Sequence, residues 1–243
     1  MLLLILLLSL ISQVECGFIP KKYELSLTTL FDRNDEFNGE ATIHVGVTGS
    51  VKEFDLKVSK DLNVQKVTFT QGNTVQRGRA NCKFDFFYRN NCFFSAIIQP
   101  TQIKMNEKEN KVHATLLSAI TPESIKEEGF ITVEYKGKIG KKDAKKGLYF
   151  SSNNADLETD LKNGNAIYLF PILEDVAAPL TLSVIAPYRT GVETNLKDGE
   201  HKSFAGSPSS LFSNNFNSGN EKMKISDLKL KINAPRALIL QSS

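Results

Sequence analysis

The sequence contains few of the residues and motifs on which catalysis depends. Its three histidines, His44, His113 and His201, are far apart, and the zinc motif His-Glu-x-x-His is absent. A hydrolytic zinc site needs three converging ligands and an open position for water, so we expect structural or surface histidines. The serine motif Gly-x-Ser-x-Gly and the phosphate-binding loop ending in Gly-Lys-Ser/Thr are also missing. We therefore expect no enzymatic activity, no metal and no cofactor.

The chain also lacks a strong net charge and an Asn-x-Ser/Thr glycosylation signal. A charge of +3 gives no case for nucleic acid binding. One basic segment, residues 136–146, contains a single acidic residue, Asp143, and six lysines: Lys136, Lys138, Lys141, Lys142, Lys145 and Lys146. Such a loop suits contact with anionic lipid or sulfated glycan, but no aromatic residue lies among the lysines, which favours a solvated loop.

The amino terminus has the features of a secretory signal. Residues 2–11 form an apolar run that is too short to span a bilayer, and small residues follow near position 16. We interpret residues 1–16 as a cleaved signal peptide and residues 17–243 as one secreted, extracellular domain. The alternative is a retained anchor, because a positive n-region is missing. Membrane contact of the mature chain is expected to be peripheral at most.

Cysteine is scarce, with three residues in the chain. Cleavage of the signal would remove Cys16 and leave Cys82 and Cys92, an even pair close in sequence in an oxidising compartment. We expect a disulfide that stabilises by about 2 to 3 kcal/mol. The alternative, two thiol zinc ligands, would require two more ligands nearby.

Short apolar and polar alternations recur along the chain and predict an all-β domain with an antiparallel sheet. The expected strands are residues 23–30, 41–47, 51–58, 64–70, 83–88, 93–98, 111–117, 130–139, 180–185 and 223–232. A single helical turn is expected at residues 121–128, where Pro122 follows Thr121 as a potential cap. Two polar stretches, residues 151–165 and 213–222, are expected to be loops.

The opening residues 18–46 contain a recognisable pattern: Pro20, Tyr23, an alternating strand, and then Phe37-x-Gly39 at the start of a second alternating strand. Tyr135-x-Gly137 ends a later strand, and the sequence Gly-Leu-Tyr follows from position 147. These segments resemble, in the same order, the amino-terminal β-domain of aminopeptidase N-type zinc metallopeptidases. The resemblance implies a large saddle-shaped antiparallel sheet or β-sandwich.

Residues 168–187 resemble the next block of that family, which normally contains Phe-Pro-Cys-Phe-Asp-Glu-Pro. Here Phe170 and Pro171 are kept, Glu174 and Asp175 replace Asp-Glu, and the segment that holds a substrate's amino terminus is missing. The exopeptidase motif and the zinc helix of the family's catalytic domain are absent too. Because the matching block of the family lies toward that catalytic domain, the resemblance implies an interface in this chain at Phe170, Pro171 and Leu173.

We conclude from the sequence that this is a secreted, non-catalytic domain that binds an extracellular protein or peptide, either a peptidase or a second copy of itself. One alternative is an accessory or truncated form of a zinc aminopeptidase that takes part in peptide processing. Another is a module that binds anionic glycan or lipid through the lysines of residues 136–146.

Overall fold

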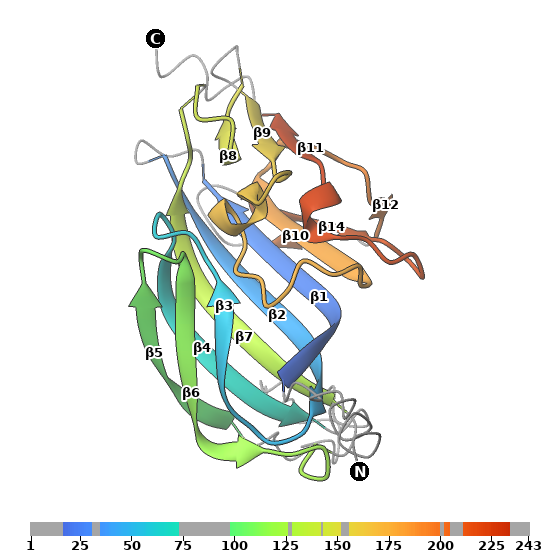
Figure 1. Ribbon diagram of the computed structural model, residues 1–243. Helices are drawn as coiled ribbons and strands as arrows, with labels where there is room; N and C mark the ends of the chain where they lie inside the picture. The colour runs from blue at the N-terminus through green and yellow to red at the C-terminus, as the bar shows by residue number, and fades with distance from the viewer. Residues whose placement is uncertain are drawn as a thin grey trace, which may run out of the picture.

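The chain folds into an all-β structure, which confirms the fold class expected from the sequence (Figure 1). The computed structural model describes residues 17–30, 35–72, 98–125, 128–141, 143–151, 156–199, 202–204 and 211–233. None of the helical segments within these ranges has the length and apolar character needed to cross a bilayer. The elements are β1 (Gly17–Thr29), β2 (Glu36–Thr48), β3 (Val51–Lys57), β4 (Asn63–Gly72), β5 (Ile98–Asn106), β6 (Lys111–Ile120), β7 (Glu128–Lys138), β8 (Gly147–Phe150), β9 (Asp156–Asp160), β10 (Leu180–Pro187), β11 (Gly191–Thr194), β12 (Lys197–Asp198), β13 (Lys202–Phe204), β14 (Leu211–Asn217) and β15 (Leu230–Asn233), with the short 3-10 helices η2 (Asn165–Tyr168) and η3 (Ile225–Asp227).

Eleven of the described strands form one large sheet in the order β12, β14, β10, β1, β2, β7, β4, β5, β6, β3, with β13 beside β14. All neighbours pair antiparallel except β1 and β10, which are parallel. The expectation of an antiparallel sheet is therefore wrong for this pair. Parallel neighbours need a long crossover, and the chain of residues 30–179 between the two strands provides one.

The expected first hairpin is present as β1 and β2, which pair over almost their whole length. Tyr23, Leu25 and Leu27 are buried on one face of β1, whereas Glu24 and Ser26 face outward. This alternation follows from the two-residue repeat of a strand, since one face of the sheet packs on the core and the other is solvated. The outward face of the central strands is therefore polar.

The large sheet bends at β5, so that β3, β5 and β6 form a second layer over the central strands (Figure 1). The ring of Phe18 on β1 packs edge-on against Phe54 of β3, with ring centroids 5.3 Å apart, and stacks on Phe69 of β4 at 5.2 Å. The core lies between these layers, as the expected sandwich requires.

A second, four-stranded antiparallel sheet has the order β11, β15, β9, β8. Between β9 and β10 the chain passes through η2 and then through residues 169–173, all of which are buried. The backbone of Ile172 exchanges two hydrogen bonds with Lys57 at the edge of β3, of 2.7 and 3.0 Å. Residues 169–173 thus fasten the second layer of the large sheet to the connection that leads into β10.

Three local expectations were wrong. Residues 151–165 and 213–222 contain strands β9 and β14 rather than only loops. Their polar composition is typical of loops, but in the structure these side chains face solvent or pair across strands, as Ser213 does with Ser183. The expected strand 223–232 is interrupted by η3. The expected helical turn is present over residues 121–125, where the amides of Ser124 and Ile125 both donate to the carbonyl of Thr121, and β7 begins at Glu128.

Candidate binding surface

The histidines are not arranged as metal ligands in the part of the chain that the structure describes. No group of three or more His, Cys, Asp or Glu residues there could hold a metal ion. His113 lies on β6 and contacts Asp55 of β3, with Nδ1 2.9 Å from the carboxylate. His44 lies on β2, and His201 is outside the described residues. Cys82 and Cys92 also lie outside them, so the disulfide remains a prediction.

His44 is buried on the otherwise solvated face of the sheet, between two carboxylates. Its Nε2 atom is 3.0 Å from Glu24 and its Nδ1 atom is 3.2 Å from Glu128. Both contacts are close, but neither meets the angles of a well-formed hydrogen bond, and they are ion pairs only when the imidazole is protonated. The two ring nitrogens point apart and the carboxylates therefore do not converge, which excludes a shared metal at this place.

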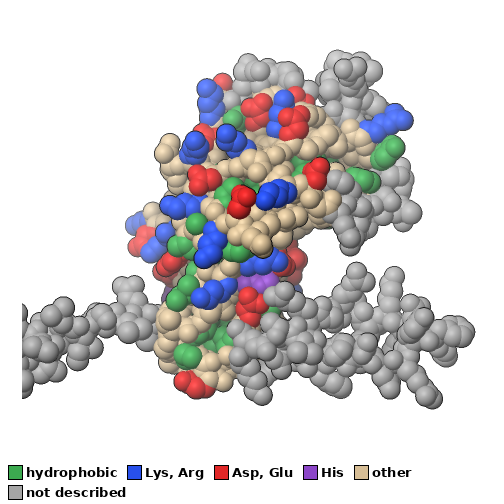
Figure 2. Space-filling model, turned by 90° about the vertical axis from the view of Figure 1, so that its right-hand side faces the viewer, with side chains coloured by type: hydrophobic (Ala, Val, Ile, Leu, Met, Phe, Trp, Pro, Cys, Tyr) green, Lys and Arg blue, Asp and Glu red, His purple; other side chains and the backbone are tan. Residues whose placement is uncertain are grey.

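The electrostatic effect of this cluster is clearest at Glu24. Interaction with His44 is the main cause that lowers the pKa of the Glu24 carboxyl from 4.5 to about 2. Partial burial opposes the shift, and the Lys22 ammonium, 2.6 Å from the carboxylate, adds to it. Glu24 therefore carries a negative charge at any physiological pH. Figure 2 shows a histidine side chain in the narrow middle part of the molecule, with basic as well as acidic side chains around it.

The three residues proposed as an interface lie in the core instead. Phe170 is 0% exposed, Leu173 is 8% exposed, and Pro171 is buried. The segment pairs with β3 through Ile172, and Phe170 and Leu173 belong to the hydrophobic core cluster. Their side chains cannot touch a partner while the domain is folded, so an interface has to be sought elsewhere.

Glu174 and Asp175 follow this segment in a loop. The Tyr23 hydroxyl donates a hydrogen bond to the carbonyl of Glu174, and burial raises the pKa of Tyr23 well above its usual range. The Asp175 carboxylate accepts a hydrogen bond of 3.3 Å from the amide of Ser226. Both residues therefore anchor the loop to neighbouring elements.

The lysines of residues 136–146 have different surroundings. Lys136 and Lys138 are exposed on one face of β7, and Lys141 and Lys145 are exposed in the connection to β8. Lys146 instead lies over the ring of Tyr168, with Nζ 4.0 Å from the ring centroid, and 3.8 Å from the carboxylate of Asp61. Lys142 is outside the described residues. The loop thus offers four exposed lysines, whereas the fifth described one is held by contacts within the chain.

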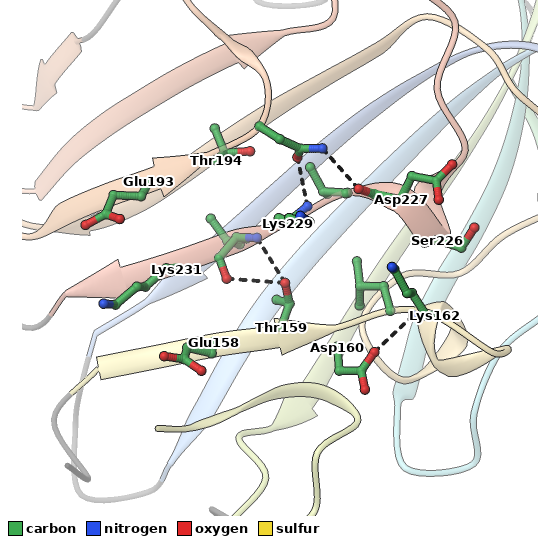
Figure 3. Close-up of a pocket in the computed structure, with 14 residues that line it drawn as sticks. Glu158, Thr159, Asp160, Lys162, Glu193, Thr194, Ser226, Asp227, Lys229 and Lys231 are labelled. Carbon is green, nitrogen blue, oxygen red and sulfur yellow. Dashed lines mark hydrogen bonds between the residues drawn. The ribbon is translucent and has the colours of Figure 1, made fainter. Parts of the chain in front are cut away.

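A hollow of about 490 Å³ lies on the small sheet (Figure 3). Hydrogen bonds from side chains to the backbone connect the segments at the base of this hollow. Thr159 exchanges hydrogen bonds with the backbone of Leu230, and Asn195 bridges the carbonyl of Asp227 and the amide of Lys229. Opposite charges alternate across its strands, with Lys231 of β15 paired in register between Glu193 of β11 and Glu158 of β9. Such compensated charges are typical of a solvated sheet face.

A different hollow lies on the outer face of the large sheet. Two contiguous depressions of about 370 and 290 Å³ share Ser26 and Glu40 and extend over β14, β10, β1, β2, β7 and β4. We call them together the sheet groove. Their lining includes the carboxylates of Glu24, Glu40 and Glu134 and no Lys, Arg or His side chain. The other side chains that face outward here are mostly hydroxyls and amides, which come from alternate positions of the strands.

Strand pairing places the acidic residues of the sheet groove close together. Glu40 on β2 is directly opposite Glu134 on β7, and Ser26 on β1 is opposite Glu40 on its other side. Glu134 forms an ion pair of 2.9 Å with Lys66, whereas Glu40 forms none with any described residue. Like charges directly opposite each other destabilise a sheet. A positively charged ligand over Glu40 would remove this repulsion.

The sheet groove was missed from the sequence. Glu24, Glu40 and Glu134 belong to three strands that are distant in the chain. The sequence shows that each glutamate occupies an outward position in an alternating segment. This pattern predicts which face of the strand carries the glutamate, but not which strands lie next to each other in the sheet.

The comparisons with known proteins concern the fold. No protein-family model and no curated protein matches the sequence. Among solved structures, the chain is similar to an M1 zinc metallopeptidase from Deinococcus radiodurans, with a TM-score of 0.63 and 14% identity. It is similar to a two-domain M1 zinc metallopeptidase mutant bound to L-arginine, with a TM-score of 0.63 and 15% identity. Each match covers 89% of this chain and 42% of the other.

This likeness shows that the chain has the fold of the amino-terminal β-domain of these peptidases, as the sequence resemblance implied. The chain spans less than half the length of the matched structures, and the match does not extend over their catalytic part.

Proposed function

We propose that this chain is a secreted, non-catalytic domain that binds a basic segment of an extracellular polypeptide in the sheet groove. The fold match supports the non-catalytic part of the proposal, because it covers only the β-domain of zinc peptidases.

The observation that carries the proposal is the acidic lining of the sheet groove, in which Glu24 and Glu134 pair with Lys22 and Lys66 but Glu40 forms an ion pair with no described residue. Three carboxylates line it without a basic side chain, although the whole chain has a net charge of +3. Glu24 stays ionised because the pKa of its carboxyl is lowered to about 2. Complementary charge steers association and selects partners, so the groove favours cationic ligands.

The shape of the groove favours an extended ligand. It runs across six strands and is lined by short side chains that include Ser26, Thr42 and Ser183. Short hydroxyl and amide groups leave the long side chains of Arg or Lys room to reach the carboxylates and form charge-assisted hydrogen bonds. A peptide with several basic residues matches these properties.

A direct test measures binding of a fluorescein-labelled nine-residue peptide in which three arginines alternate with serines. We expect Glu40→Gln to weaken binding about five- to tenfold, corresponding to roughly 1 to 1.4 kcal/mol. The matched control is Glu53→Gln, at an exposed strand position on β3 in the second layer. Absence of binding, or equal loss in both variants, would refute the proposal. The same protein should not hydrolyse aminoacyl arylamides in the presence of zinc.

A second candidate is an accessory or truncated form of a zinc aminopeptidase. The observation in its favour is the match to 42% of such enzymes. Addition of the purified chain should then change the rate at which a separate aminopeptidase cleaves a basic peptide. No change in that rate would exclude this role for the enzyme tested.

A third candidate, binding of anionic glycan or lipid, would use the exposed lysines Lys136, Lys138, Lys141 and Lys145. Retention on heparin that falls when all four are replaced by Gln would support this role. Unchanged retention would exclude it.

A further inference from the structure

Strand β5 changes partners along its length. Residues 98–100 pair with β4, and Thr101 to Asn106 pair with β6 on the opposite side. The Thr101 hydroxyl, which donates to the carbonyl of Val67, marks the point where β5 separates from β4. In an antiparallel pair only every second residue directs its N–H and C=O toward the partner. The other backbone groups of Thr101 to Asn106 therefore point to a side where no described strand pairs.

The side chains of β5 show that this side is open. Ile103 and Met105 are 40% and 37% exposed, although they are paired in register with Ala114 and Val112 of β6, which are 0% and 2% exposed. Residues that are paired in register share a face of the sheet, so Ile103 and Met105 face the core side and still contact solvent. The edge of β5 thus combines backbone groups that pair with no described strand with two apolar side chains.

The edge strand β3 provides a contrast at the other end of this layer. Its inward residues Phe54 and Leu56 are buried, and Ile172 pairs with the backbone of Lys57. Natural sheets protect their edges in such ways, and a long open edge next to exposed apolar residues marks a place where another strand pairs.

We infer that the open edge of β5 receives an extended segment of a partner protein as an added strand, with apolar residues against Ile103 and Met105 and an acidic residue opposite Lys104. Addition of a strand to a sheet edge is a recurrent mode of peptide recognition. This surface lies on a different part of the sheet from the groove and selects the opposite charge, so it stands independently of the proposed function.

Lys104 determines the kind of partner. It is exposed on the outer face of β5 and forms no ion pair with a described residue, while its neighbour across the pair, His113, already contacts Asp55. An acidic residue on the added strand would pair with it across the strands. A second copy that paired through the same edge, centred on this position, would place two lysines opposite each other. The charge thus favours an acidic strand of a partner over self-association.

The test uses two acetylated, fluorescein-labelled peptides, in which valine alternates with glutamate or with lysine, and the purified chain. We expect the glutamate peptide to bind the wild-type chain at least fivefold more tightly than the lysine peptide, and Lys104→Glu to reverse this preference. Lys104 is exposed, so the variant should fold normally. The matched control is Lys52→Glu, at an exposed position on β3, which should leave the preference unchanged.

A third peptide distinguishes strand addition from simple charge attraction. It is the glutamate peptide with alternate backbone amides methylated on the edge that would pair, which removes hydrogen bonds without changing charge. We expect its binding to fall more than tenfold. The inference would be overturned if the methylated and unmethylated peptides bound equally well, or if Lys104→Glu kept the wild-type preference between the glutamate and lysine peptides. It would also be overturned if the chain formed a dimer whose stability changed in Lys104→Glu.

Discussion

Tyr135 lies across Gly39 on the neighbouring strand, so that a Cβ atom at position 39 would come 2.2 Å from the Cζ atom of the tyrosine. The reverse arrangement occurs two residue pairs further along, where a Cβ atom at Gly137 would come 2.3 Å from the Cζ atom of Phe37. The two aromatic rings meet edge-to-face with centroids 6.5 Å apart. Each ring thus covers the glycine opposite it, an arrangement that stabilises glycine within a strand.

This reciprocal packing predicts that neither glycine tolerates a side chain. Gly39→Ala and Gly137→Ala should each lower the free energy of unfolding by about 2 kcal/mol, because the rings are held in the core and cannot move aside. Gly17→Ala is the control, since nothing lies within 4 Å of the added Cβ. Urea denaturation measures the three differences. Equal stability of all three variants would show that the rings of Tyr135 and Phe37 move aside at little cost in free energy.

A related prediction concerns the Tyr135 hydroxyl, whose removal should not lower the free energy of unfolding. The hydroxyl is buried and has no hydrogen-bond partner in the described structure, and burial raises the pKa of the tyrosine. Tyr135→Phe should therefore leave stability unchanged or increase it by up to about 1 kcal/mol, because an unsatisfied polar group is removed. A clear loss of stability in urea denaturation would mean that the hydroxyl has a partner.

The burial of Phe170 predicts a structural role for this residue. Phe170→Ala should lower the free energy of unfolding by about 3 to 5 kcal/mol, since it leaves a cavity in the hydrophobic core. At temperatures where the variant is folded, its affinity for the arginine peptide should equal that of the wild type. Weakened peptide binding without loss of stability would instead indicate that Phe170 lies at a binding interface.

Glu24 predicts a pH dependence of stability. Its carboxyl has a pKa lowered to about 2, so its stabilising contribution is present above pH 4.5 and is lost as the pH falls toward 2. Glu24→Gln should cost less than about 2 kcal/mol at pH 7, because the carboxylate is 42% exposed and partly screened. The difference from wild type should shrink between pH 4.5 and 2.

Urea denaturation at several pH values measures this difference. His44→Gln should remove most of it, since His44 is the main cause of the lowered pKa. A difference that stayed constant with pH would contradict the ion pair.

The predicted disulfide between Cys82 and Cys92 can be examined in secreted material. Mass mapping without reduction should find the two peptides joined. Two thiols that react with an alkylating reagent would disprove the bond.

The fold was best predicted where side-chain packing requires a recognisable motif in the sequence. Phe37-x-Gly39 and Tyr135-x-Gly137 are readable as motifs because each aromatic residue requires a glycine opposite it, and these motifs led to the correct fold. The strands with regular apolar alternation, such as β1 and β7, were also predicted. β9 and β14 were not, because their side chains are largely polar and their backbone pairing has no compositional signal.

The binding surfaces depend on which strands are neighbours. Glu40 and Glu134 are far apart in sequence and meet only through the pairing of β2 with β7, which no local pattern reveals. Phe170 was assigned to an interface by analogy with proteins in which a further domain follows. Its burial here results from the backbone pairing of Ile172 with Lys57, which also has no local signal.

Amide chemical-shift mapping during titration with the arginine peptide would show whether the sheet groove binds a basic polypeptide segment. We expect saturable shifts confined to the strands that line the groove, largest around Ser26, Asn38 and Glu40, and smaller in Glu40→Gln at the same peptide concentration. Shifts located on the small sheet, or no shifts at all, would contradict binding in the groove.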